Sequence, residues 1–129
     1  MLDTKQICSD FLGEIGLKFT FNTQISLKQI PADFIADDEK FWYIVELKQT
    51  MKDCEKSIPQ ILRYYNLLTR YEYYRKYKHP VKLYIYFIGS ADRRAFLDYA
   101  KIYRDYLANP NCPSIEFYYR NDEDKLEKA

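Results

Sequence analysis

The sequence predicts an α/β domain in which a mixed central sheet is flanked by helices. Segments with helical spacing of apolar residues alternate along the chain with segments rich in strand-favouring residues, which is the pattern of such domains. A length of 129 residues suits one domain, and a hydrophobic content of 47% suffices for its core. We expect the element order αβββαβαβ, with the domain over residues 1–120 and a charged, frayed tail over 121–129.

The first half of the chain is expected to hold one helix and a meander of three strands. Apolar residues at helical spacing predict a helix over 4–15, which Gly16 can end in a left-handed conformation. Alternating patterns then predict strands over 18–27, 31–36 and 41–48. Because the connections between these strands are too short for crossovers, we expect neighbouring strands to run antiparallel.

The second half is expected to alternate helix and strand. A long helix is predicted from Ser57 to about Lys78, with Ser57 as its cap. The almost entirely apolar run 81–88 is typical of a central strand that is buried on both faces. A helix over 93–107 and a last strand over 115–120 complete the domain.

The composition argues against several kinds of site. Three scattered cysteines and a single histidine do not supply a disulfide framework or a zinc motif. Neither standard Gly-rich phosphate loop occurs in the sequence. The first residues lack the features of a signal peptide, and no apolar run approaches the ~20 residues that cross a bilayer. We therefore expect a cytoplasmic protein with no membrane partner.

Acidic and basic side chains meet in the expected third strand. Glu46 and Lys48 are two residues apart and therefore share one face of that strand. A hairpin with the preceding strand can bring Asp33 beside Glu46, and two adjacent carboxylates favour a cation such as Mg²⁺ between them. A lysine beside such a metal could orient or deprotonate a water molecule. From the spacing alone, a solvent-exposed Glu/Lys pair with an unrelated Asp33 explains the pattern equally well.

Two short motifs resemble those of one nuclease superfamily. Pro31-Ala-Asp33 followed by Glu46-Leu-Lys48 resembles the PD-(D/E)xK motif of the restriction-endonuclease-like nucleases, with Ala32 inserted between the proline and the aspartate. Gln60-Ile-Leu-Arg-Tyr64 is similar to the Q-x-x-x-Y helix motif of RecB-like members. The core order of that superfamily, αβββαβ, is the order expected here over residues 4–88. The resemblance implies a restriction-endonuclease-like fold and metal-dependent hydrolysis of DNA.

The resemblance also implies a metal site. The expected cofactor is Mg²⁺, for which Mn²⁺ would substitute, bound by Asp33, Glu46 and the backbone carbonyl of Leu47. The family's further acid on the first helix matches either Asp10 or Glu14, which lie one turn apart. We favour Glu14, because the neighbouring glycines leave room for a close approach of the backbone. No iron–sulfur cluster of the kind that some RecB-like members bind through four cysteines is expected.

The other catalytic residues that the resemblance implies are Lys48, Gln60 and Tyr64, beside the carboxylates of Asp33 and Glu46. Lys48 would position the attacking water. Gln60 and Tyr64 would lie one turn apart on the long helix and would orient the lysine or the substrate strand.

The net charge of +1 is the sum of two oppositely charged segments. Residues 31–55 carry seven acidic and three basic side chains, whereas residues 56–82 carry seven basic side chains and one acid. Basic residues interleaved with tyrosines can bind phosphates and stack on bases, so we expect Arg63, Arg70 and Arg93 to contact DNA. The simpler alternative is that the tyrosines cover the sheet while the basic residues are solvated.

Three functions stay open on the sequence alone. The first is a metal-dependent nuclease that acts on DNA. The second is a catalytically inactive module that keeps the nuclease fold and binds DNA or protein. The third is a junction-specific resolvase, which would need a dimer so that two sites meet two strands. A homodimer or a larger nuclease complex is the kind of assembly that these functions imply.

Overall fold

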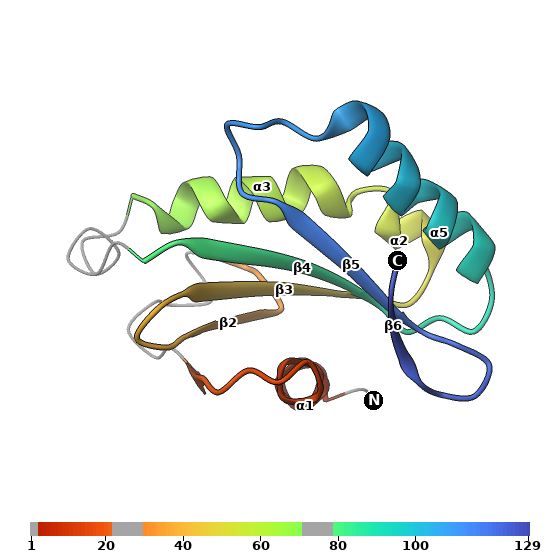
Figure 1. Ribbon diagram of the computed structural model, residues 1–129, viewed down its shortest axis with the longest axis horizontal. Helices are drawn as coiled ribbons and strands as arrows, with labels where there is room; N and C mark the ends of the chain where they lie inside the picture. The colour runs from red at the N-terminus through yellow and green to blue at the C-terminus, as the bar shows by residue number, and fades with distance from the viewer. Residues whose placement is uncertain (1–2, 22–29, 71–78) are drawn as a thin grey trace.

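The strands of this protein form one mixed sheet between two layers of helices (Figure 1). The computed structural model describes residues 3–21, 30–70 and 79–129. Within them, the strands are β1 (Thr20–Phe21), β2 (Phe34–Asp37), β3 (Trp42–Lys48), β4 (Val81–Phe87), β5 (Ile115–Arg120) and β6 (Leu126–Lys128). The helices are α1 (Thr4–Glu14), α2 (Met51–Cys54), α3 (Ser57–Leu68) and α5 (Arg93–Ile102), which continues into the π-helical turn η1 (Tyr103–Leu107).

The described strands pair in the order in which they follow one another along the chain. Strands β1, β2 and β3 are antiparallel neighbours, as the meander predicts. Strands β3, β4 and β5 are parallel, because helical crossovers connect them, and β6 is antiparallel to β5. The predicted α/β class, with a mixed sheet flanked by helices, is therefore confirmed.

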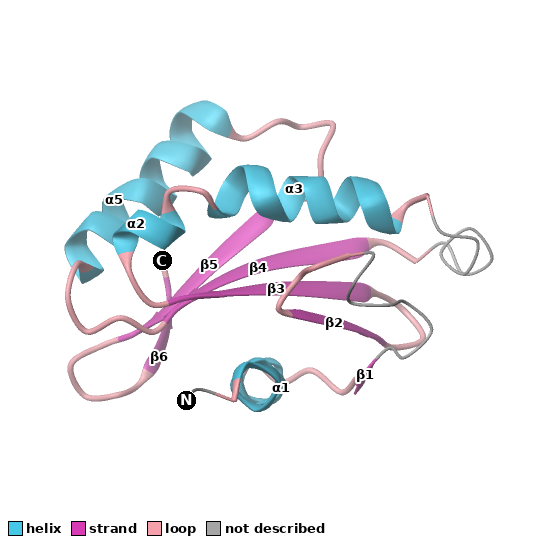
Figure 2. Ribbon diagram, turned by 180° about the vertical axis from the view of Figure 1, so that it is seen from behind, coloured by secondary structure: helices cyan, strands magenta, loops and turns pink. Residues whose placement is uncertain are grey.

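The two faces of the sheet are covered by different helices (Figures 1 and 2). Helix α1 lies on one face, and α2, α3 and α5 lie on the other. Side chains alternate along β3, so that Trp42 and Ile44 belong to the core beneath α3 while Tyr43 and Val45 belong to the core beneath α1. Glu46, two residues beyond Ile44, therefore projects toward α3.

The first two strands begin later than predicted. Thr20–Phe21 forms β1, and the rest of the expected first strand, from residue 22 on, lies outside the described residues. Strand β2 begins at Phe34, later than predicted. At this end, the N–H of Leu47 donates to the side chain of Asp33 at 2.7 Å, so it does not extend the ladder with a backbone carbonyl of the preceding segment.

Helix α3 ends at Leu68, whereas the sequence predicts a helix to about Lys78. The N–H groups of Thr69 and Arg70 bond to carbonyls of the last turn and close it. Residues 71–78, the rest of the predicted helix, lie outside the described part of the chain. No helix in the described ranges has the length and apolar character needed to cross a membrane.

The C-terminal tail, predicted to fray, forms strand β6 instead. Leu126–Lys128 pairs with Tyr118–Arg120, and the N–H of Ala129 donates to the carbonyl of Phe117 at 2.8 Å. The ammonium of Lys128 also donates to Glu116 at 2.8 Å. The open edge of β5 offers backbone groups to the tail, and these groups pair with it in spite of its many charges.

Gly89 follows β4 and lies against the backbone that follows β3. A Cβ atom at this position would collide with the carbonyl oxygen of Gln49 and would lie 2.7 Å from the ring of Phe87. Glycine is therefore the residue that lets the ends of β3 and β4 approach each other, next to Lys48.

We expect Gly89→Ala to lower the free energy of unfolding by about 1–3 kcal/mol, because the methyl group forces these two backbones apart. Urea denaturation measures the change. Gly13→Ala on α1 is the matched control, because a Cβ there meets nothing within 4 Å. In the control the helix should gain about 0.5–1 kcal/mol. Equal stability of the two variants would contradict the close approach at Gly89.

Candidate functional site

The adjacent ends of β2 and β3 bring Asp33 and Glu46 side by side. The backbone N–H of Asp33 donates to Glu46 Oε1 at 3.0 Å, and the N–H of Leu47 donates to Asp33 Oδ2 at 2.7 Å. The register pairs Phe34 with Val45, so Asp33 lies opposite Glu46 where the ladder ends. Each carboxylate is thus held by a backbone N–H of the neighbouring strand, in the hairpin that the sequence predicts.

Both carboxylates lie in surroundings that disfavour their charge. Burial raises the pKa of Glu46 to about 7, and the negative charge of Asp33 adds to the increase. Burial also raises the pKa of Asp33, although the N–H of Leu47 and the charge of Lys48 oppose the increase. Glu46 is only 3% exposed. A buried and a half-buried carboxylate side by side form a site that a bound cation stabilises.

Lys48 supplies the positive charge nearest to Glu46. Its Nζ lies 3.5 Å from Glu46 Oε2 and donates to Gln60 Oε1 at 2.7 Å. Gln60 belongs to the first half of α3, so the ammonium is held between the sheet and the helix that covers it. Because the lysine side chain is 11% exposed, these two contacts fix its position in a largely enclosed place.

Tyr64 lies one turn after Gln60 on the same helix and is 8% exposed. Burial raises the pKa of its hydroxyl, and the negative charges of Glu46 and Asp33 raise it further. The charges of both carboxylates therefore influence the ionisation of Tyr64, which lies on the helix that covers them. The two polar residues of the Q-x-x-x-Y segment thus face the strand end that carries the Glu-x-Lys segment.

Arg63 and Arg70 lie on the solvent side of α3 and at its end. Both are exposed, and both line a groove of about 480 Å³ together with Asn66, which lies between them in the sequence. The two arginines thus line one groove, Arg63 from within α3 and Arg70 from the turn that follows its last residue.

Glu14 and Arg93 lie around a different cavity, of about 420 Å³. Glu14 accepts a hydrogen bond from Arg120, and Arg93 is ion-paired with Asp122. These contacts do not involve Asp33 or Glu46. Among the described residues, the structure therefore does not bring Glu14 or Arg93 to the carboxylate pair.

Asp10, the alternative acid of the first helix, accepts a hydrogen bond from the side chain of Gln6 at 2.8 Å. On α1, the residue whose ionisation the carboxylate pair affects is Cys8, which is fully buried. Burial raises the pKa of its thiol, and the charges of Asp33 and Glu46 raise it further. No sequence signal distinguishes Cys8 from an ordinary core cysteine.

No group of three or more His, Cys, Asp or Glu side chains within the described residues is arranged to hold a metal ion. The predicted metal ligands that the structure does bring together are therefore the carboxylates of Asp33 and Glu46, beside the backbone of Leu47.

Comparisons with protein-family models, with curated proteins and with solved structures find no match for this chain. The interpretation of the site therefore rests on its sequence motifs and its geometry.

We expect Lys48→Met to lower the free energy of unfolding by about 1–3 kcal/mol in metal-free buffer, because it leaves buried Glu46 and half-buried Asp33 without their counter-charge. Adding Glu46→Gln removes one of these charges and should restore most of the loss. Urea denaturation of the wild type, both single variants and the double variant measures the coupling energy.

Lys101→Met is the matched control for this cycle. Lys101 pairs with Asp105 on the surface, and its side chain is 68% exposed. Its replacement should therefore change the free energy of unfolding by less than about 0.5 kcal/mol. If Lys48→Met cost no more than Lys101→Met, the ammonium of Lys48 would not compensate the buried carboxylates.

Proposed function

We propose that this protein is a metal-dependent nuclease with a restriction-endonuclease-like fold that hydrolyses phosphodiester bonds of DNA. The observation that carries the proposal is the reciprocal pairing of Asp33 with Glu46 and Leu47, beside the contact between Lys48 and Gln60. The residues of two separate sequence motifs meet at one end of β3. An unrelated Asp33 and a solvent-exposed Glu46–Lys48 pair do not explain this meeting.

The order of the elements supports the same proposal. Among the described residues up to Phe87, α1 is followed by three antiparallel strands, then by α3 and by the parallel strand β4. This succession agrees with the αβββαβ order of the superfamily that the motifs resemble, with the short α2 as an addition.

The donor set fits a divalent cation. Asp33 and Glu46 present hard oxygen ligands. Burial disfavours the charged form of both carboxylates, and the charge of Asp33 further disfavours that of Glu46, so a nearby cation would stabilise the charged pair. These two residues would hold Mg²⁺ or Mn²⁺, and the resemblance adds the carbonyl of Leu47. When bound, such a cation supplies a more acidic water and neutralises charge on the phosphate.

The protein's own side chains contribute position and charge. Lys48, fixed by Glu46 and Gln60, presents an ammonium that can orient the attacking water and stabilise negative charge on the phosphate. Arg63 and Arg70 line the solvent side of α3, where backbone phosphates farther along the strand can bind them. Helix α3 and the turn after it would thus position Lys48 through Gln60 and also bind the phosphates of the nucleic acid through Arg63 and Arg70.

A second candidate function is a module with the same fold that binds DNA or protein without cutting it. The observation that favours it is the engagement of Glu14 with Arg120 and of Asp10 with Gln6. Because the first-helix acid is engaged elsewhere, the described residues supply two acidic side chains to the metal site, Asp33 and Glu46, and not the three that the resemblance implies.

We expect Glu46→Gln to lower the rate of DNA cleavage at least about a hundredfold while DNA binding stays largely intact. The amide keeps an acceptor for the N–H of Asp33 but removes the ligand charge. Cleavage of single-stranded, double-stranded and branched DNA with MgCl₂ measures the rate, and a gel-shift assay in chelator measures binding. Glu55→Gln, at an exposed acid between α2 and α3, is the control and should cut like the wild type. An equal rate for Glu46→Gln would refute this mechanism.

Titration of MgCl₂ or MnCl₂ into the metal-free protein should show saturable heat and should raise Tm, because the cation binds the folded state. Glu46→Gln should lose both effects. Without metal, this variant should melt higher than the wild type, because it removes one of two buried like charges. If the wild type showed neither heat nor a rise in Tm with either ion, and did not cut DNA, the non-cutting module would be favoured.

A further inference from the structure

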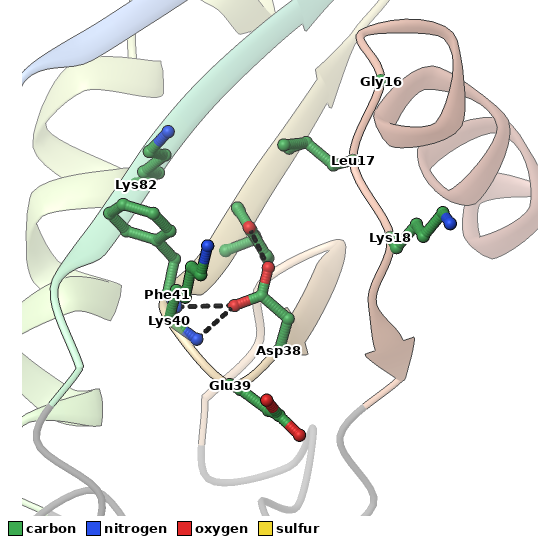
Figure 3. A pocket seen from close by; sticks show the side chains of 9 residues that line it. Gly16, Leu17, Lys18, Asp38, Glu39, Lys40, Phe41 and Lys82 are labelled. Atoms are coloured by element: carbon green, nitrogen blue, oxygen red, sulfur yellow. Dashed lines mark hydrogen bonds between the residues drawn. The ribbon is translucent and has the colours of Figure 1, made fainter.

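A separate cavity of about 620 Å³ lies at the opposite end of β3 from the carboxylate pair (Figure 3). We call it the Phe41 cavity. Its lining residues are Gly16, Leu17, Lys18, Asp38, Glu39, Lys40, Phe41, Tyr43 and Lys82. Its volume falls within the roughly 300–1,000 Å³ that is typical of small-molecule sites.

Both oxygens of the Asp38 carboxylate, which lines this cavity, accept hydrogen bonds from the protein. Asp38 Oδ1 accepts the N–H groups of Lys40 and Phe41 at 2.6 and 2.7 Å. The other oxygen, Oδ2, accepts the hydroxyl of Tyr43. Asp38 therefore holds the turn between β2 and β3, and the ammonium groups around it remain available to a ligand.

Two ammonium groups lie beside the ring of Phe41 (Figure 3). Lys82 Nζ is 4.2 Å from the ring centroid, and Lys40 extends along the same side of the turn. Within the described part of the chain, neither lysine is ion-paired with a carboxylate. Lys18 and Glu39 point away from this pair. Asp38 keeps one negative charge in the lining, but its oxygens already accept hydrogen bonds from the turn and from Tyr43, so the two ammonium groups beside Phe41 stay without an ion-pair partner among the described residues.

The wall next to these ammonium groups is apolar. Leu17 points toward β3 in Figure 3, and the half-buried ring of Phe41 lies across from it. A ligand that fills this space needs a flat apolar part for the wall and an anionic part for the lysines. Lysine ammonium groups act on phosphate as point charges, whereas planar carboxylates are better matched by arginine.

We infer that the Phe41 cavity binds a nucleoside phosphate, with the base against Leu17 and Phe41 and the phosphate between Lys40 and Lys82. The ligand is either a free nucleotide or one unit of a nucleic-acid strand, which present the same chemistry. The site is independent of the proposed nuclease centre, because it shares no residue with the carboxylate pair or with the Lys48–Gln60 contact.

The test titrates adenosine 5′-monophosphate, adenosine, inorganic phosphate and a short oligothymidylate into the full chain in chelator, where metal-dependent cleavage is absent. Amide shifts of Lys40, Phe41 and Lys82 in the NMR spectrum locate binding, and calorimetry gives the affinity. The monophosphate or the oligothymidylate should shift these amides. The ligand that does so should bind at least about tenfold more tightly than adenosine or inorganic phosphate, because it uses both parts of the cavity.

Three variants separate the two parts of the cavity from the nuclease centre. Lys40→Gln combined with Lys82→Gln should weaken nucleotide binding at least about tenfold, because two charge-assisted contacts are lost. Phe41→Leu should weaken nucleotide binding but not the binding of inorganic phosphate. Glu46→Gln should bind the nucleotide like the wild type, and Lys101→Gln on α5 is the control for a general loss of positive charge.

The outcomes are distinct. Binding of the monophosphate identifies a free nucleotide as sufficient, whereas binding of the oligothymidylate alone through the same residues identifies a strand unit. Either result supports the inference. Equal affinity for inorganic phosphate and the nucleotide, shifts confined to other residues, or no binding of any probe would overturn it, whatever the activity of the carboxylate pair.

Discussion

The hydrogen bonds exchanged between Asp33 and the Glu46–Leu47 segment are the constraint on which the rest of this structure depends. Each carboxylate accepts a backbone N–H from the neighbouring segment, and Asp33 Oδ2 takes the N–H of Leu47 in place of a backbone carbonyl at the end of the β2–β3 ladder. The arrangement places two like charges at the edge of an apolar core. Lys48 offsets this repulsion in part and ties the strand end to Gln60 of α3. The site therefore reduces the stability of the strands that form it.

Much of the sheet and the centre of the site could be predicted from the sequence, because both rest on local periodicity. The alternation along 41–48 places Glu46 and Lys48 on one face. The short turn before it forces an antiparallel partner, which brings in Asp33. One-turn spacing then places Gln60 and Tyr64 on the same side of their helix. Each of these inferences uses neighbours within one strand, one hairpin or one helix.

The remaining features depend on packing that no local pattern reveals. Which residue of α1 faces the site is set by the rotation of that helix about its axis, and this rotation follows from the burial of Phe11 and Leu12. The same rotation buries Cys8 in the core beneath α1 and leaves Asp10 and Glu14 exposed. The sequence prediction for the tail is wrong, because its charges indicate solvation whereas the open edge of β5 supplies backbone partners that the charge pattern does not reveal.

The short separation between Asp33 and Glu46 has a consequence for how the chain folds. The two residues are 13 positions apart and meet through a hairpin, whereas β3 and β4 meet only after a helical crossover. Loop-closure entropy grows with the length of the loop, so this hairpin costs less entropy to close than the pairing of β3 with β4. The two carboxylates thus belong to a segment of low contact order, and α3 docks onto a strand end where they already repel each other.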